Sequence, residues 1–249
     1  MTDKPVALVS GANAGIGFEV ARGLTTHGFT VLVGSRDAAR GAESAARIGN
    51  DAHPVQLDVT DEASITAAAD RMRTDFGRLD VLVNNAGVSF VGDPSTPLQE
   101  RGAMGLLTVV PLETVREIFE TNVFGVIALT QAMLPLLRKS PEARIVNVGS
   151  SGGSLTLNSD PANPHRAMFG VYPTSKAALH AVTVGFAATL ESEGIRVNAA
   201  DPGFTSTALN NFQGTKSVED GARRIVELAL LGPDGPSGTF SSDEGPVPW

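Results

Sequence analysis

The stretch Val6-Ala-Leu-Val9-Ser10-Gly11-Ala-Asn-Ala-Gly15-Ile-Gly17 leads from a short apolar run through a glycine-rich turn into a helical pattern at residues 18–24. A continuous apolar run of this length is typical of a buried parallel strand. In such a strand–turn–helix unit Gly11 permits the tight turn, Gly15 lets the backbone approach a pyrophosphate, and Gly17 lets the helix pack closely. The order predicts a dinucleotide-binding unit, although the spacing G-x-x-x-G-x-G also fits an ordinary turn.

Outward from this unit, apolar runs recur at residues 30–33, 55–59, 79–83, 144–148 and 195–200, and helical patterns separate them. This alternation predicts an α/β fold, a doubly wound parallel sheet with helices on both faces. The Gly- and Pro-rich stretch from Gly232 to Trp249 is expected to add a seventh strand. No linker, repeat or low-complexity tract interrupts the chain, so residues 1–249 are expected to form a single domain.

The composition argues against several classes of protein. The 249 residues are 42% hydrophobic and 18% charged, which fits neither a disordered chain nor a membrane protein. No apolar run is expected to reach the roughly 20 residues of a spanning helix. Zero cysteines exclude disulfides and thiolate metal sites, and a net charge of −8 argues against nucleic-acid binding. Because the N-terminus lacks a signal-peptide pattern, we expect a cytoplasmic protein.

The end of the second apolar run indicates which nucleotide would bind. An acidic residue about 20 positions beyond the glycines would bind a ribose 2′-hydroxyl and repel a 2′-phosphate. This chain has Gly34-Ser35-Arg36-Asp37 at that place, and the guanidinium of Arg36 suits a phosphate. The sequence therefore favours NADP(H), while the adjacent Asp37 keeps NAD(H) open.

Polar residues follow three further strands. Asp58 could accept a hydrogen bond from an adenine amino group or act as a turn acid before the next helix. Asn84-Asn85-Ala86-Gly87 could face a ligand at the carboxyl end of the sheet or tie strands together. Ser150 and Ser151 could polarise a substrate carbonyl or be plain turn residues.

Tyr172 is the only tyrosine of the chain, and Lys176 follows it by four positions. Pro173 suits the first position of a helix, so the two side chains are expected on one helix face. We expect the nearby ammonium to lower the pKa of the Tyr172 phenol from its ordinary value of about 10 toward neutrality. An isolated Y-x-x-x-K spacing also arises by chance. It indicates a catalytic pair only together with a cofactor site elsewhere in the chain. Asn122, in a long helix expected from Leu112, is either a satisfied structural amide or a group that holds a relay water.

Six features occur in one order along the chain: Gly11-x-x-x-Gly15-x-Gly17, Asn84-Asn85-Ala86-Gly87, a helical Asn122, a serine after a strand, Tyr172-x-x-x-Lys176 and Pro202-Gly203. In this order they resemble the short-chain dehydrogenase/reductase family over residues 6–207. The resemblance implies a Rossmann-type sheet of about seven strands. It also implies hydride transfer between a nicotinamide and a carbonyl or alcohol.

By the same resemblance, Tyr172 is the general acid or base, and Lys176 lowers its pKa and contacts the nicotinamide ribose. Ser150, with Ser151 as the alternative, stabilises the carbonyl oxygen, and Asn122 holds a relay water. The residues that the resemblance implies in cofactor binding are Gly11, Asn13, Gly15, Ile16, Gly17, Arg36, Asp58, Val59, Asn85, Ala86, Gly87, Tyr172, Lys176, Pro202, Gly203, Thr205 and Thr207. No metal site is expected.

Within the family, the Ser35-Arg36-Asp37 segment and the 22-residue spacing from Ser150 to Tyr172 are similar to NADPH-dependent carbonyl reductases. An insert of this kind tends to obstruct the helix face used for tetramers, so a monomer and a homo-oligomer both stay open. Ala14 stands where NADP-preferring members often have a basic residue, which leaves Arg36 largely alone. We therefore expect a carbonyl reductase or alcohol dehydrogenase whose partner is a small to medium, mostly apolar ketone or aldehyde.

Other functions stay open at this point. An epimerase or dehydratase on the same scaffold usually has a larger C-terminal domain, for which this chain has no room. A non-catalytic NADP-binding regulator would not need the tyrosine, lysine, serine and asparagine, and an NAD-dependent alcohol or steroid-type dehydrogenase is a further alternative. The pocket walls are expected from residues 89–111, 154–168 and 204–217.

Overall fold

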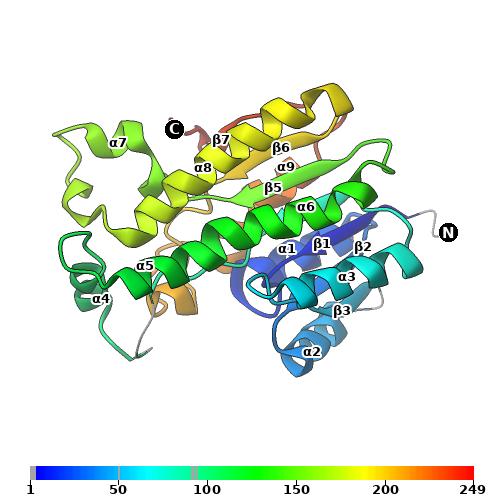
Figure 1. Ribbon diagram of the computed structural model, residues 1–249, viewed down its shortest axis with the longest axis horizontal. Helices are drawn as coiled ribbons and strands as arrows, with labels where there is room; N and C mark the ends of the chain where they lie inside the picture. Colours follow the sequence, from blue (N-terminus) through cyan, green and yellow to red (C-terminus); the bar gives the residue numbers. More distant parts are fainter. Residues whose placement is uncertain (1–3, 50, 91–92, 94) are drawn as a thin grey trace.

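The computed structural model describes residues 4–49, 51–90, 93 and 95–249. Strands within these residues form one sheet in the order β3-β2-β1-β4-β5-β6-β7-β8 (Figure 1). They are β1 (Val6–Val9), β2 (Thr30–Ser35), β3 (Ala52–Gln56), β4 (Val81–Asn84), β5 (Arg144–Val148), β6 (Arg196–Ala200), β7 (Phe240–Ser242) and β8 (Gly245–Pro246). All neighbours pair in parallel except β7 and β8, which are antiparallel.

Helices cover both faces of this sheet. They are α1 (Gly15–Thr26), α2 (Ala38–Ile48), α3 (Glu62–Asp75), α4 (Leu98–Met104), α5 (Leu112–Phe119), α6 (Gly125–Leu137), α7 (Leu155–Ser159), α8 (Val171–Leu190) and α9 (Val218–Ala229). α3, α6 and α8 lie in front of the sheet in Figure 1, and α1, α2 and α9 pack on the other face. The fold is therefore the predicted doubly wound α/β sheet with helices on both faces.

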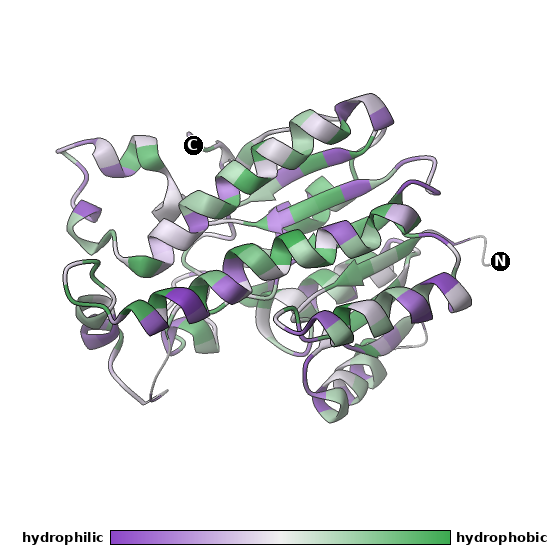
Figure 2. Ribbon diagram, in the orientation of Figure 1, coloured by the Kyte–Doolittle hydropathy of each residue, from purple (hydrophilic) through white to green (hydrophobic). Residues whose placement is uncertain are grey.

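Each face of the sheet has its own hydrophobic core. Leu82 packs in the core under α3, α6 and α8, whereas its neighbour Val83 packs in the core with α1 and α9. This alternation follows from the two-residue repeat of a strand. Figure 2 shows the hydrophobic residues along the central strands and α6, and hydrophilic ones along α3. Burial on both faces explains why the strands read as continuous apolar runs.

The structure corrects several sequence-based boundaries. The third strand ends at Gln56, not at residue 59, because Asp58 forms a turn with Thr60. β8 adds an eighth, antiparallel strand at the edge of the sheet. α8 begins at Val171, so Pro173 is the third residue of the helix and not the first.

The long helix expected from Leu112 is interrupted. A π-helical turn, Glu120–Phe124, lies between α5 and α6 and contains Asn122. Gly125 follows it, and a Cβ at Gly125 would lie only 2.8 Å from the carbonyl oxygen of Val59. π-helical turns are rare and often occur at functional sites.

The combined run Leu112–Leu137 is long and apolar enough to cross a membrane by length and composition, contrary to the expectation that no run would be. Half of its most apolar window is buried inside the protein, where α6 packs against the sheet. The core helix of a soluble protein passes the same test. The finding is therefore weak evidence for a membrane span.

A chain of polar side chains crosses the core beneath α6 and α8. Thr130 Oγ1 on α6 accepts a hydrogen bond from Asn84 Nδ2 at 3.1 Å, and Asn84 Nδ2 also donates to Asn147 Oδ1 at 2.8 Å. Asn147 Nδ2 then donates to Thr183 Oγ1 on α8 at 2.9 Å. All four side chains are buried, so these hydrogen bonds connect the two helices through β4 and β5.

Candidate active site

The turn after β1 has the conformation that its glycines predict. Gly11 and Gly15 have φ angles of +63° and +58°, in the left-handed region that other residues rarely adopt. Gly17 has no room for a side chain, because a Cβ there would lie 2.4 Å from Asn85 Nδ2 and 2.6 Å from Gly11 O. The turn is therefore packed directly against the end of β4.

α1 presents an N-terminus that no side chain caps. Its N-cap, Ala14, supplies no side-chain hydrogen bond, and the first turn has no acidic residue. The first N–H groups and the helix dipole therefore suit an anion. A Cβ at Gly15 would meet only the Thr207 side chain, at 3.5 Å, which is ordinary van der Waals contact, so Thr207 lies next to this turn. Asn13 and Ile16 belong to the same turn, and Asn13 O accepts a hydrogen bond from the Ser44 hydroxyl at 2.9 Å.

Ser10 and Asn85 join the ends of β1 and β4. The Ser10 hydroxyl accepts hydrogen bonds from the N–H groups of Asn85 and Ala86, each at 3.0 Å. Asn85 Nδ2 donates to the carbonyl oxygens of Ser10 at 2.8 Å and Gly11 at 3.1 Å. The Asn85 side chain therefore ties β1 to β4, which is the structural one of the two roles expected for the Asn84-Asn85 segment.

Arg36 is exposed at the end of the second strand and makes no ion pair or side-chain hydrogen bond with the residues that the structure describes. Asp37 instead caps α2 by accepting a hydrogen bond from Arg40 N at 3.0 Å, and it lies 3.6 Å from the Arg40 guanidinium. Asp37 therefore serves as the N-cap of α2, and NAD(H) stays possible beside NADP(H). Arg40 is a second cation that the sequence reasoning missed, although its spacing from Asp37 was visible.

Asp58 shapes the turn before α3. Its Oδ1 accepts hydrogen bonds from the backbone N–H and the hydroxyl of Thr60, at 2.9 and 2.8 Å. Asp58 therefore acts as a turn residue before α3. Its second carboxylate oxygen has no hydrogen bond with the residues that the structure describes. Val59 is buried beside it against Gly125.

Tyr172, Ser150 and Lys176 lie together at the carboxyl end of β5. Lys176 is one turn after Tyr172 on α8, with its Nζ 5.7 Å from the centroid of the Tyr172 ring. The Ser150 hydroxyl lies beside the Tyr172 phenol and acts to lower its pKa. Lys176 is buried and donates a hydrogen bond from Nζ to Val148 O at 2.8 Å. The structure thus brings Ser150, the first of the two predicted serines, to Tyr172.

The protonation of this group differs from the expectation. The pKa of Tyr172 is raised to about 12, mainly by burial and also by the charge of Asp201, and Ser150 opposes both effects. Burial also lowers the pKa of Lys176 to about 8, although Asp201 favours its charged form. The expected lowering of the Tyr172 pKa by Lys176 is therefore wrong for this structure, because loss of solvation is the larger effect.

Asn122 binds the segment after β4 with its side chain. Its Oδ1 accepts a hydrogen bond from Val88 N at 2.8 Å, and its Nδ2 donates to Val88 O at 2.8 Å and to Ser175 Oγ at 3.0 Å. Ser175 Oγ in turn donates to Tyr172 O at 2.7 Å. The side chain is a satisfied amide that links Val88 to the first turn of α8.

The turn after β6 contains the predicted Pro202-Gly203 pair. Gly203 has a φ of +70°, and its N–H donates to Asp201 Oδ1 at 3.0 Å. Thr205 is buried, and its hydroxyl donates to Pro202 O at 2.9 Å. These contacts fix the backbone that leads to Thr207 and the glycine turn.

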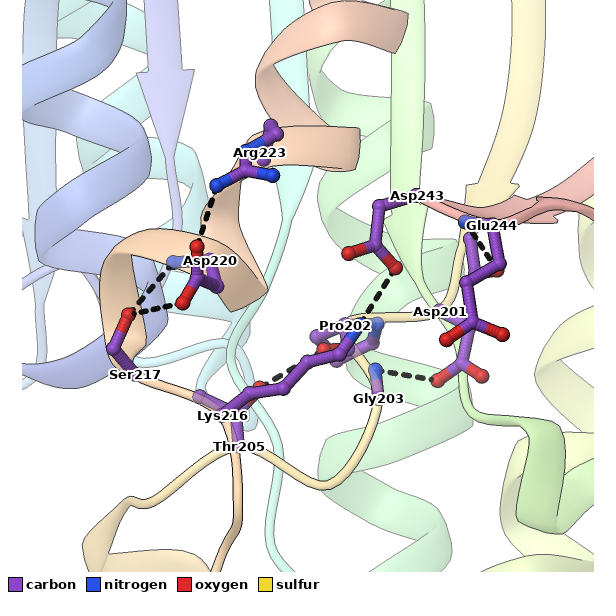
Figure 3. A network of polar contacts seen from close by, with 11 residues as sticks. Asp201, Pro202, Gly203, Thr205, Lys216, Ser217, Asp220, Arg223, Asp243 and Glu244 are labelled. Carbon is purple, nitrogen blue, oxygen red and sulfur yellow. Dashed lines mark hydrogen bonds and ion pairs between the residues drawn. The ribbon is translucent and has the colours of Figure 1, made fainter.

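Lys216 lies across this turn and was not among the predicted site residues. Its Nζ would lie 3.2 Å from a Cβ at Gly203, and it forms an ion pair of 2.6 Å with Asp243 Oδ1 in the β7–β8 hairpin. Figure 3 shows the lysine side chain reaching past Pro202 and Gly203 to that carboxylate. The ion pair holds the end of the 204–217 segment against the C-terminal hairpin.

The three predicted wall segments contain most of the exposed large apolar side chains. Eight of the eleven among the described residues belong to them: Met104, Leu107, Val109, Leu155, Leu157, Met168, Phe204 and Phe212. Residues 91, 92 and 94 of the first segment lie outside the described residues. Val171 N donates to Gly105 O at 2.8 Å, and Ser89 Oγ donates to Leu209 O at 2.8 Å, so the first segment contacts α8 and the third segment. Exposed apolar side chains of this kind are candidates for contact with an apolar partner.

Comparisons with known proteins agree with this geometry. The sequence model of the family described as short chain dehydrogenase matches residues 5–217. The chain is 33% identical to (+)-neomenthol dehydrogenase from Capsicum annuum, with 96% of each chain covered. Salutaridine reductase from Papaver somniferum has a similar structure, with a TM-score of 0.80, 30% identity, and coverage of 96% of this chain and 100% of that chain. A putative short chain dehydrogenase from Shigella flexneri, solved in complex with NADP, has a TM-score of 0.79 at 26% identity, with 98% of each chain covered. The chain belongs to the short chain dehydrogenase family of oxidoreductases.

Proposed function

We propose that this enzyme is an NADP(H)-dependent carbonyl reductase that acts on a mostly apolar ketone or aldehyde. The observation that carries the proposal is the partly buried Tyr172 beside Ser150, with the buried Lys176 one helical turn away, at the carboxyl edge of the sheet. The glycine turn after β1 opens on the same edge. A proton donor and a nucleotide cradle at one sheet edge are what a nicotinamide-dependent reduction needs.

The residues present fit a dinucleotide. The left-handed Gly11 and Gly15 and the uncapped N-terminus of α1 would hold the pyrophosphate. Arg36 would bind a 2′-phosphate, and Arg40 is close enough to Asp37 to reduce its repulsion. The complex of the Shigella flexneri relative with NADP supports this choice, while the Brucella melitensis 3-ketoacyl-(acyl-carrier-protein) reductase, solved with NADH at 26% identity, keeps NAD(H) possible. When bound, NADPH would supply the hydride.

The chain itself supplies the proton. With a pKa raised to about 12, Tyr172 carries its proton across the neutral range and suits a general acid. It would donate that proton to the carbonyl oxygen while the Ser150 hydroxyl donates a second hydrogen bond to the same oxygen. Lys176, with a pKa lowered to about 8, is mainly an ammonium at pH 7 and stabilises the negative charge that develops on the Tyr172 oxygen. At neutral pH the phenol is therefore in the protonated form that the reducing direction needs.

Asn122 and the walls position these groups. The hydrogen bonds from Asn122 to Val88 and Ser175 fix the start of α8, and therefore the Tyr172 backbone. The exposed apolar side chains of the wall segments would cover an apolar substrate. (+)-Neomenthol dehydrogenase, whose name indicates an alcohol as substrate, supports this substrate class. We place the reaction in the cytoplasm, in one domain of residues 1–249.

The test is turnover of a panel of cyclic and open-chain apolar ketones and aldehydes, with NADPH and separately with NADH. Oxidation of the cofactor is followed by the loss of absorbance of the reduced nicotinamide, and binding is measured in parallel by calorimetry. We expect reduction of several members of the panel with a preference for NADPH. Tight NADPH binding without oxidation by any carbonyl compound would contradict the proposal and favour a binding protein.

A further inference from the structure

Asp201 is a buried carboxylate at the carboxyl end of β6, with 6% of its surface exposed. Side chains alternate along a strand, and Val197 faces the core under α6 and α8, so Asp201 faces the same side. Its Oδ1 accepts the Gly203 N–H, and among the described residues it has no cation within ion-pair distance. A buried charge costs free energy unless an opposite charge or hydrogen bonds compensate it.

The sheet register brings this carboxylate to the base of the catalytic helix. Val148 on β5 pairs with Ala200 on β6, so Gly149 lies opposite Asp201. Val148 O accepts the hydrogen bond of Lys176 Nζ, and a Cβ at Gly149 would lie 2.8 Å from His180 Nε2. The face of α8 that carries Lys176 and His180 therefore covers the strand end next to Asp201.

Lys176 and Asp201 are complementary in charge. Lys176 is buried, with 5% of its surface exposed, and its hydrogen bond goes to an uncharged carbonyl oxygen. Inside a protein two opposite charges attract over a longer range than in water, because the surroundings screen them less. The charge of Asp201 accordingly raises the pKa of Lys176 and also the pKa of Tyr172, in each case after the larger effect of burial.

We propose that Asp201 is a positioning residue of the catalytic machinery, the counter-charge that keeps Lys176 as an ammonium and Tyr172 as a phenol. This role rests on the proposed reduction, which needs both groups protonated. It adds to Tyr172, Ser150, Lys176 and Asn122 a residue on a different strand. Its position directly before Pro202-Gly203 also connects it to the turn that would contact the cofactor.

The other charged groups around this position do not replace Asp201. His180 on α8 stays neutral, because burial and Lys176 lower its pKa to about 4. On the β7–β8 hairpin, Asp243 is paired with Lys216, and Glu244 lies on the exposed tip. From α9, the partly exposed Arg224 forms an ion pair with Glu227 and donates to Ser241 Oγ.

Asp201→Asn tests the proposal with little change of shape. The asparagine keeps an oxygen that can accept the Gly203 N–H and removes only the negative charge. The chain has four lysines, Lys4, Lys139, Lys176 and Lys216, so lysine labelled with carbon-13 at Cε gives few signals, and Lys176→Arg assigns the one of interest. We expect the titration midpoint of Lys176 to fall by roughly one pH unit in Asp201→Asn, the direction expected when an opposite charge is removed.

The dependence of kcat on pH is a second measurement of the shift in the Lys176 titration midpoint. The loss of kcat at alkaline pH should move to lower pH in Asp201→Asn by the same amount as the Lys176 midpoint. Asp243→Asn removes one negative charge from the adjacent hairpin and is the matched control, which should leave the midpoint of Lys176 unchanged. Asp201→Glu keeps the charge and should restore most of the wild-type profile.

An unchanged Lys176 midpoint in a folded Asp201→Asn protein would overturn the proposal, as would an equal shift in Asp243→Asn. If Asp201→Asn does not fold, Asp201→Ser, which keeps a hydroxyl acceptor for Gly203, gives the same comparison. The NMR titration needs no turnover. A shifted midpoint in an enzyme that reduces no carbonyl compound would therefore refute the proposed function and leave the charge coupling in place.

Discussion

The proposed nucleotide half of the site and the proposed substrate half are built by different means. Around β1 and α1, backbone and buried side chains are joined at short distances: Ala12 N donates to Gly34 O at 2.8 Å, and Ser10 with Asn85 closes the turn from the other side. The substrate half consists of three long segments, of which the first and third meet through side-chain hydrogen bonds from Ser89 Oγ to Leu209 O and from Asn211 Nδ2 to Thr96 O. Apolar side chains are buried in the first half and exposed in the second.

This difference shows which half can vary. A side chain added at Gly11 or Gly17 in the nucleotide half meets backbone atoms, whereas the exposed apolar side chains of the walls face solvent or substrate. We therefore expect substitutions in the first half to change folding or cofactor affinity. Substitutions in the second half should change substrate affinity, with Tyr172 at the junction of the two.

Tyr172→Phe should have the largest effect. Removing the phenol oxygen takes away the proton donor, which contributes roughly 100- to 10,000-fold to a rate. We expect kcat to fall by about three orders of magnitude, while the Kd for NADPH, measured by calorimetry, changes less than about two-fold. Turnover close to that of the wild type would refute the role of Tyr172 and with it the junction between the halves.

Gly17→Ala should destabilise the fold. The new Cβ would lie 2.4 Å from Asn85 Nδ2 and 2.6 Å from Gly11 O, and such overpacking costs about 1–3 kcal/mol or more. Gly185→Ala is the matched control, because nothing lies within 4 Å of a Cβ there and alanine favours the helix interior by roughly 0.5–1 kcal/mol. Urea unfolding measures both, and similar stabilities of the two variants would show that the nucleotide half is less tightly packed than described.

Arg36→Gln should weaken the binding of NADPH much more than the binding of NADH. Loss of a charge-assisted hydrogen bond to the 2′-phosphate costs about 1.5–3 kcal/mol, so the Kd for NADPH should rise roughly ten- to a hundred-fold. The Kd for NADH should hardly change. Arg73→Gln on α3, which removes a surface arginine paired with Asp70, should affect neither. An equal loss for both nucleotides would remove the argument for NADP(H).

Phe212→Ser should have the smallest effect. Phe212 is 70% exposed and has a φ of +59°, so this bulky side chain is held toward solvent in a backbone conformation that favours glycine. If it covers an apolar substrate, its loss should raise KM several-fold and leave kcat and NADPH affinity nearly unchanged, because burial of an aromatic ring contributes about 1–2 kcal/mol. An unchanged KM across the ketone panel would exclude Phe212 from the wall.

The sequence predicted the nucleotide half well, for a physical reason. Strands buried on both faces read as continuous apolar runs, and glycines with positive φ angles or no room for a Cβ mark the turn between Val9 and Phe18. The four-residue spacing of Tyr172 and Lys176 also specifies a shared helix face, which the structure confirms. These features depend on neighbours that are close in sequence.

Features that depend on distant neighbours were not predictable in the same way. The π-helical turn at Asn122 has no local signal, and the short strand β8 is too brief to show a pattern. The direction of the Tyr172 pKa shift depends on burial by several segments and on Asp201, which is 29 positions away. The arrangement of the wall segments depends on loops, whose contacts are formed only in the folded protein.

The polar chain from Thr130 through Asn84 and Asn147 to Thr183 has a consequence for this chemistry. A purely apolar layer would let α6 and α8 shift along the sheet at little cost in free energy. Here such a shift would leave a buried amide without its hydrogen-bond partner. These four polar side chains therefore fix the positions of α6 and α8 along the sheet. As a result, the hydrogen bonds also fix the positions of Tyr172 and Lys176 relative to the strand ends, even where the wall segments change around a different substrate.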